Sequence, residues 1–158
     1  MSIATTMHTA VRRAEEADLP ALCALLERLF ALEEDFEFDP GRSRAGLAAM
    51  LEHPAGVLLA ADDGRGVAGM VSGQVTVSTA EGGPAVVVED LVVREDARGR
   101  GIGSALLAAL ERWALARGAR RMQLLADVDN TPALDFYRRR GWTGTNLVCL
   151  RRVMPQGG

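Results

Sequence analysis

The chain contains no lysine and no long hydrophobic run, and these absences exclude two classes of partner. All 18 cationic residues are arginine and the formal net charge is −3, so the cationic surplus typical of nucleic-acid-binding domains is missing. No segment has the roughly 20 consecutive apolar residues that cross a bilayer, and the first residues lack the basic start and apolar run of a signal peptide. We therefore expect a cytoplasmic protein that binds neither nucleic acid nor membrane.

Cysteine and histidine are also scarce, which argues against a disulfide framework and against a metal site. Cys23 and Cys149 lie in apolar surroundings, on an expected helix and an expected strand. Reduced, buried thiols fit these positions better than a disulfide, which stays an open alternative. His8 and His53 show no ligand spacing, so no metal is expected.

The remaining composition is that of one globular domain, which we expect to cover residues 1–158. Apolar residues make up 48% of the chain and charged residues 25%, as is typical of such domains. Strand-forming runs occur at residues 9–13, 57–62, 67–77, 85–93, 122–126 and 147–153. One helix is predicted to begin after the capping residue Asp18, and three further helices are predicted over residues 42–52, 103–117 and 132–140. This order favours an antiparallel meander followed by a strand–helix–strand unit, hence a mixed α/β (α+β) sheet with helices on its faces.

A glycine-rich turn between the expected strand at 85–93 and the helix that follows is the most informative segment. Glycines let the backbone approach a ligand, and the first amide N–H groups of a helix have no partner within the helix. Those groups and the helix dipole form an anion site, to which arginine adds planar donors. We therefore expect a pyrophosphate to lie against Arg98, Gly99, Arg100, Gly101, Gly103 and Ser104.

Two familiar phosphate-binding loops fit this turn poorly. A P-loop requires a lysine after its last glycine, and the chain has none. A dinucleotide-binding fingerprint requires a third glycine where Ser104 stands and no residues between strand and glycines, whereas residues 94–97 intervene. A nucleotide oxidoreductase is therefore the weakest alternative.

Two segments together resemble a known family. The pattern Arg98-x-x-Gly101-x-Gly103, between a strand and a helix, resembles motif A of the GNAT N-acetyltransferase superfamily. The segment from Asn130 to Trp142 resembles its motif B. The resemblance covers residues 86–142 and implies a GNAT-like, mostly antiparallel sheet with a central parallel strand pair and helices on both faces. It also implies acetyl-CoA as cosubstrate, bound by Leu91, Val92, Val93, Arg98, Gly99, Arg100, Gly101, Ile102, Gly103, Ser104, Asn130, Ala133, Phe136 and Tyr137.

Two carboxylates in the middle of an apolar strand are candidate catalytic groups. Glu89 and Asp90 are neighbours, so on a regular strand they face opposite sides of the sheet. A carboxylate in apolar surroundings has a raised pKa and can accept the proton of an ammonium group, directly or through water. The alternative is a strand end whose acids pair with arginine side chains. Which of the two acids acts as the base stays open.

The resemblance also assigns roles to two residues of motif B. It implies that Tyr137, the chain's one tyrosine, donates a proton to the departing thiolate, and that Asn130 contacts the pantetheine arm. Without the resemblance, Tyr137 would be expected to pack against the sheet with its hydroxyl in water. Asn130 would then only cap the helix that follows it.

The segment between the first two expected helices combines aromatic and acidic residues. Phe30, Phe36 and Phe38 lie beside an acidic run that starts at Glu33 and Glu34. The resemblance implies that this region forms a wall of the acceptor pocket, so Phe30, Glu33, Glu34 and Glu89 are candidate substrate-binding residues. An acidic wall suits a cationic amine, whether a small molecule or a protein amino group. The alternative is a solvated acidic turn held by aromatic anchors.

The sequence thus predicts an acetyl-CoA-dependent N-acetyltransferase in which the amine attacks the thioester directly in a ternary complex. A non-catalytic acyl-CoA-binding or sensor domain on the same fold is the alternative, although binding alone needs neither the carboxylate pair nor Tyr137. The oligomeric state stays open; homodimers are frequent among such enzymes and among proteins generally.

Overall fold

The computed structural model describes residues 8–157. Packing divides the chain into two units, Met1–Leu124 and Leu125–Gly158, and each is described by itself. That residues 1–158 form a single domain stays a prediction.

A five-stranded sheet forms the centre of the first unit. Its strands are β1 (Ala10–Arg13), β2 (Gly56–Asp62), β3 (Val67–Ser78), β4 (Gly83–Val93) and β5 (Met122–Leu124). They lie in the order β1-β2-β3-β4-β5. The first four are antiparallel neighbours, which confirms the meander, and β5 pairs parallel to β4. The parallel pair lies at an edge of the sheet rather than at its centre, because no strand follows β5 within residues 8–157.

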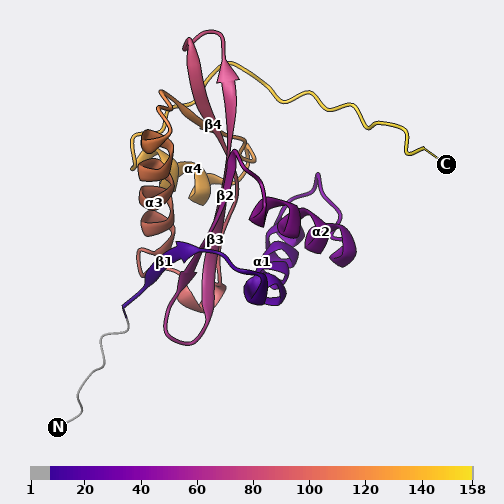
Figure 1. Ribbon diagram of the computed structural model, residues 1–158, viewed down its shortest axis with the longest axis vertical. Coiled ribbons are helices and arrows are strands. Elements are labelled where there is room, and N and C mark those ends of the chain that lie inside the picture. The colour runs from indigo at the N-terminus through magenta and orange to yellow at the C-terminus, as the bar shows by residue number, and fades with distance from the viewer. Residues whose placement is uncertain (1–7, 158) are drawn as a thin grey trace. The chain divides into compact units, whose positions relative to one another are not determined.

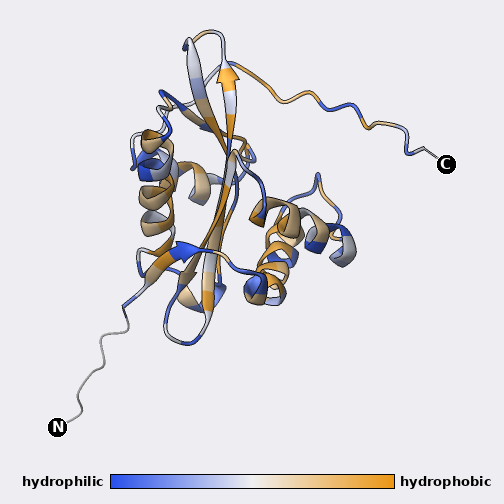
Figure 2. Ribbon diagram, viewed as in Figure 1, coloured by the Kyte–Doolittle hydropathy of each residue, from blue (hydrophilic) through white to orange (hydrophobic). Residues whose placement is uncertain are grey.

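Helices cover both faces of this sheet, as predicted (Figure 1). The helices α1 (Leu19–Leu32) and α2 (Pro40–Leu51) lie on one face, and α3 (Ile102–Ala116) lies on the other. Four residues of α1 are buried against the sheet: Leu19, Leu22, Leu25 and Leu26. Figure 2 shows hydrophobic residues concentrated in the central strands and in α1 and α3. Burial of these apolar surfaces is the main force that holds the layers together.

Glycines on β3 let α3 approach the sheet closely. A Cβ atom at Gly73 would lie 2.7 Å from Leu110 Cδ1, and one at Gly69 would lie 3.1 Å from Leu106 Cδ1. Both leucines are fully buried. The helix therefore packs directly on the backbone of β3, and this contact fixes the start of α3.

The start of α1 differs in detail from the prediction. Asp18 occupies the N-cap position, but its carboxylate does not cap α1. It accepts hydrogen bonds from Arg12 at 2.7 and 2.9 Å and from the Glu15 amide at 2.8 Å. A guanidinium fork is a stronger partner than a helix amide, so Asp18 ties β1 to a short 3₁₀ turn, η1 (Glu16–Asp18).

The second unit contains the helix α4 (Thr131–Arg138). Asn130 caps it, because its side-chain oxygen accepts the Ala133 amide at 3.2 Å. Gly141 follows the helix with φ of 84°, a conformation that ends helices and suits glycine.

The expected strand at residues 147–153 is wrong. Within residues 8–157 no regular structure follows α4, and the side chains of Leu147 and Leu150 are 86% and 90% exposed. Apolar alternation alone cannot make a strand, because a strand requires a ladder partner for its N–H and C=O groups. The prediction that both thiols are buried is accordingly wrong for Cys149, which is exposed, whereas Cys23 is half-buried. Neither cysteine forms a disulfide in the described part of the chain.

No helix within residues 8–157 is long and apolar enough to span a bilayer. In the same range, no group of three or more His, Cys, Asp or Glu side chains is placed to hold a metal ion.

Candidate active site

The ladder between β3 and β4 is interrupted where the two predicted catalytic acids lie. Met70 pairs with Val92 and Ser72 pairs with Glu89, so Asp90 and Leu91 lie opposite the single residue Val71. This arrangement is a β-bulge, which leaves one residue out of the ladder and frees backbone groups. The Ser72 hydroxyl donates to the Glu89 carbonyl at 3.1 Å and holds one side of the bulge. Strict alternation of Glu89 and Asp90 across the sheet, expected from the sequence, is therefore broken.

Asp90 is held in an unusual state by this bulge. Its φ is 54°, and it is the one residue other than glycine with positive φ in the described chain. Its pKa is raised to about 6, first because the carboxylate is removed from water and then because of the charges of Glu89 and Glu33. Positive φ and a perturbed pKa both cluster at functional sites. Glu89, by contrast, is exposed.

The acidic segment after α1 lies close enough to the bulge to act on it electrostatically. Glu33 is the C-cap residue of α1, and its charge contributes to the raised pKa of Asp90. Phe30 stacks on Phe36 with ring centroids 5.5 Å apart and lies 6.5 Å from Phe38. The three phenylalanine rings thus contact one another and anchor the segment, as the alternative interpretation expected. The charge of Glu33 acts on Asp90. Glu34 is exposed.

The glycine-rich turn leads from β4 through a 3₁₀ turn, η2 (Glu95–Ala97), into α3. Gly99 and Gly101 have φ of 75° and 78°, which only glycine adopts readily. A Cβ atom at either position would meet nothing within 4 Å, so the backbone is open to a ligand. Gly101 is the N-cap of α3 and supplies no side-chain cap, which leaves the first helical N–H groups for an anion.

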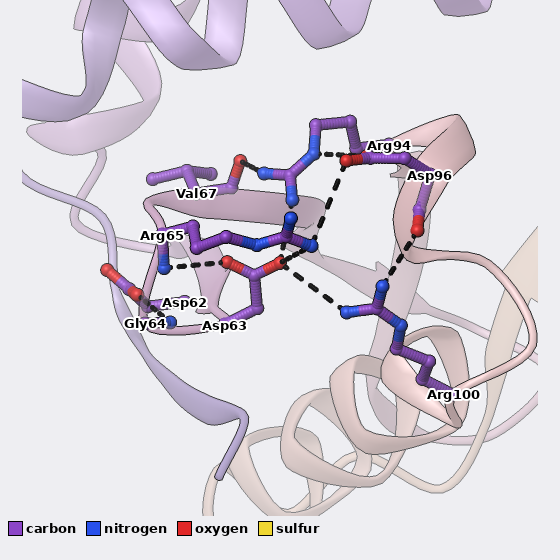
Figure 3. Close-up of polar contacts among 8 residues, drawn as sticks. All are labelled: Asp62, Asp63, Gly64, Arg65, Val67, Arg94, Asp96 and Arg100. Atoms are coloured by element: carbon purple, nitrogen blue, oxygen red, sulfur yellow. Dashed lines mark hydrogen bonds and ion pairs between the residues drawn. The ribbon is translucent and has the colours of Figure 1, made fainter. Parts of the chain in front are cut away.

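Of the two arginines of this turn, one faces solvent and one is held by the protein. Arg98 is exposed, and its guanidinium makes no hydrogen bond or ion pair with any other residue of the described chain. Arg100 donates to the Asp96 carbonyl at 3.0 Å and lies 3.9 Å from Asp63 Oδ2 (Figure 3). The open turn, the uncapped helix and Arg98 fit a diphosphate such as that of acetyl-CoA.

Asp63 is a buried carboxylate beside this turn that no sequence pattern predicted. Its side chain is 3% exposed and contacts Arg94. The run Asp62-Asp63-Gly64 reads as an ordinary turn between two strands, and burial of an acid in such a turn has no sequence signal.

In the second unit, Tyr137 lies in an aromatic cluster near the end of α4. Its ring is 5.3 Å from that of Phe136, edge to face, and 5.7 Å from that of Trp142. The Arg140 guanidinium stacks 3.6 Å from the centre of the Phe136 ring. These contacts hold the Tyr137 ring at one end of the helix, with the side chain half-buried.

Comparison with known proteins agrees with the fold. The Acetyltransferase (GNAT) family profile matches residues 19–142. A mycothiol acetyltransferase of Pseudarthrobacter chlorophenolicus is 38% identical over 121 residues, which are 73% of this chain and 37% of that protein. The chain thus spans little more than a third of the length of this curated relative.

Solved structures share the fold at lower identity. A transcriptional regulator from Bacillus halodurans superposes with a TM-score of 0.83 at 24% identity, covering 92% of this chain and all of the other. An aminoglycoside N-acetyltransferase, AAC(6')-Iy, in complex with CoA superposes with a TM-score of 0.81 at 19% identity, covering 96% and 99% of the two chains.

Proposed function

This chain belongs to the acetyltransferase (GNAT) family, and from that premise we propose that it transfers an acetyl group from acetyl-CoA to a primary or secondary amine. The observation that carries the proposal is the bulge at Asp90, where strained backbone, a raised pKa and two further carboxylates coincide. Binding alone requires none of these features, whereas deprotonation of an amine requires a base.

Acetyl-CoA supplies the activated acetyl group, and the residues of this chain bind it and move protons. We assign the diphosphate to the backbone N–H groups at Ile102, Gly103 and Ser104 and to the Arg98 guanidinium. Apart from Arg100, which the protein itself holds, the remaining cofactor-binding residues named from motif A and motif B, including Asn130, Ala133 and Phe136, keep that assignment as part of the proposal.

Asp90 is the proposed base. A pKa of about 6 leaves the carboxylate ionised at neutral pH yet more basic than an ordinary aspartate, which suits proton abstraction. The amine nitrogen then bonds to the acetyl carbon while the bond from that carbon to sulfur breaks. The backbone N–H group of Leu91, which lies in the bulge, would donate to the carbonyl oxygen, and Tyr137 would protonate the departing sulfur.

The acceptor is proposed to be a cationic amine. Glu33 and Glu89 both raise the pKa of Asp90 through their charges, so three carboxylates act on one region and would attract an ammonium group. Phe30 and Glu34 complete the proposed acceptor wall. The names of the relatives, mycothiol acetyltransferase and aminoglycoside N-acetyltransferase, define where a screen of amines should start, together with a peptide bearing a free amino terminus.

Thermal unfolding with and without acetyl-CoA tests the cofactor. Acetyl-CoA at about 100 times its dissociation constant adds roughly 2.7 kcal/mol to the free energy of unfolding, which raises Tm by roughly 5–10 °C for a chain of this size. NADH and ATP serve as controls and should leave Tm unchanged. No shift with acetyl-CoA, for folded protein free of bound CoA, would contradict the proposal.

Tyr137→Phe separates an enzyme from an acyl-CoA-binding domain. The variant keeps the ring contact with Trp142 and loses only the hydroxyl. We expect unchanged acetyl-CoA binding and a loss of roughly 10²-fold or more in the rate of thiol release. Binding by the unaltered protein without turnover of any amine would instead indicate a non-catalytic binding domain.

A further inference from the structure

The turn between β2 and β3 carries a carboxylate that is buried beside the glycine-rich turn. The Asp63 side chain is 3% exposed, and aspartate is rarely buried unless it is paired. One oxygen, Oδ1, accepts the Arg65 amide at 3.0 Å. The other, Oδ2, lies within 4 Å of three guanidinium groups, those of Arg65, Arg94 and Arg100.

Arg94 connects Asp63 to the beginning of the glycine-rich turn. It directly follows β4, and its Nη2 donates to Asp63 at 2.7 Å. Its Nη1 donates to the Val67 carbonyl at 3.2 Å, and its Nε donates to Asp96 at 2.5 Å. Because Asp96 belongs to η2, one guanidinium fastens η2 to the turn at Asp63 and to the first residue of β3, Val67.

Arg100 connects Asp63 to the far end of the same turn. It lies between Gly99 and Gly101, both with positive φ, and reaches back to Asp63 and to the Asp96 carbonyl. Figure 3 shows the Arg94, Arg65 and Arg100 side chains converging on Asp63. Glycines give the backbone freedom, so a turn that contains two of them needs such an anchor to hold one conformation.

We propose that Asp63 is a positioning residue for the anion-binding turn: by holding Arg94 and Arg100 it keeps residues 95–101 in the conformation that presents the α3 amides to the diphosphate of acyl-CoA. Arg100 then acts within the protein, and Arg98 is the arginine that meets the ligand. This inference rests on the proposed function. It predicts that Asp63 controls the affinity for acyl-CoA and leaves the transfer step itself unchanged.

Asp63→Asn tests the proposal, and Asp62→Asn is its matched control. Asp62 is the neighbouring acid; its carboxylate accepts the Gly64 amide at 2.8 Å and lies 3.8 Å from Arg12, away from the glycine-rich turn. We expect Asp63→Asn to weaken CoA binding in calorimetry about tenfold, since a charge-assisted contact is lost. KM for acetyl-CoA should rise by the same factor with kcat within about twofold. Asp62→Asn should change neither.

Amide hydrogen exchange in the protein without CoA supplies a readout independent of activity. The Ala97, Arg98 and Ala105 amides are hydrogen-bonded within or just after the turn, to Arg94, Glu95 and Gly101. In Asp63→Asn their protection should fall about tenfold, whereas protection in the middle of α3 and of β4 should not change. A general loss of stability would lower protection everywhere and would contradict a role confined to the turn.

Arg100→Gln keeps the test decisive if Asp63→Asn does not fold. Arg100 is half-exposed, and the variant breaks one arm of the network. It should weaken CoA binding three- to tenfold and expose the same amides. Where both variants fold, the double variant should bind no more weakly than Asp63→Asn, because the two residues act together; additive losses would mean that Arg100 binds the phosphate itself and would overturn the proposal.

The outcomes separate the two proposals. If the unaltered protein does not bind CoA, the proposed function fails. If it binds CoA and Asp63→Asn binds as tightly with unchanged amide exchange, only the positioning role fails.

Discussion

Asp90 joins an unusual backbone conformation to an unusual protonation equilibrium. Its φ of 54° exists because the bulge places two residues opposite Val71. The same bulge sets the carboxylate where water is scarce and Glu33 and Glu89 add negative charge. The positive φ and the buried carboxylate both lower the stability of the fold, and such unfavourable features cluster at functional sites.

Replacing Asp90 should change the pH dependence of acetyl transfer. Because the base must be ionised, kcat/KM should rise with pH and level off above about pH 6, the pKa of Asp90. In Asp90→Asn this inflection should disappear and kcat/KM at pH 7 should fall by roughly 10²–10⁴-fold. Steady-state kinetics from pH 5 to pH 9, with acetyl-CoA binding measured in parallel, check the prediction.

Glu89→Gln is the comparison variant for this experiment. It removes one neighbouring charge, so the inflection should remain and move to lower pH. If the inflection vanishes in Glu89→Gln and persists in Asp90→Asn, Glu89 is the base.

At the scale of elements, the site depends on how closely α3 lies on β3. A Cβ atom at Gly69 would meet the Val92 carbonyl oxygen at 3.1 Å and Ile102 Cγ2 at 3.2 Å. Ile102 is the first residue of α3 and is buried. Gly69 thus lets the uncapped start of α3 lie directly on β3.

Gly69→Ala should therefore impair stability and binding together. Overpacking of this kind costs about 1–3 kcal/mol in the free energy of unfolding. Because the start of α3 must move, acetyl-CoA binding should also weaken. Denaturant unfolding and calorimetry measure the two effects.

Gly46→Ala is the control for this prediction. Gly46 lies within α2, and a Cβ atom there would meet nothing within 4 Å. The change should stabilise the protein by about 0.5–1 kcal/mol through helix propensity and leave binding unchanged. Equal effects of the two alanines would show that Gly69 does not set the position of α3.

At the scale of the whole molecule, buried and paired acids give opposing pH dependences of stability. Hydrogen bonds lower the pKa of Asp18, Asp63 and Asp96, the first through Arg12, the second through the Arg65 amide and the third through Arg94. Their contribution is present above the ordinary value of 3.8 and is lost as pH falls through the lowered pKa values. Asp90 has the opposite sign, since its pKa is raised.

The free energy of unfolding should therefore pass through a maximum at about pH 4–5. Above it, between pH 4 and pH 6, stability should decline because Asp90 is ionised in the unfolded state while it is still protonated in the folded state, by at most about 3 kcal/mol for the shift from 3.8 to about 6. Urea unfolding as a function of pH measures the curve. Asp90→Asn should remove the decline, and a decline that persists in this variant would assign it to other groups.

The antiparallel meander, the helices packed on the sheet and the glycine-rich turn could all be predicted from the sequence. These features follow from local periodicity and from the backbone freedom of glycine, so they can be read without contacts. The same information made residues 147–153 resemble a strand, because alternation reports what a segment can pair with and not whether a partner is present.

Which charged groups act on one another depends on contacts between distant segments, so the sequence could not predict it. The bulge depends on the register between β3 and β4, and it places Asp90 where removal from water and neighbouring charges raise its pKa. The burial of Asp63 depends on three arginines from segments up to 37 residues away, Arg65, Arg94 and Arg100. Electrostatic energies depend on distance and on exclusion of water, and both are set by packing that no local sequence pattern records.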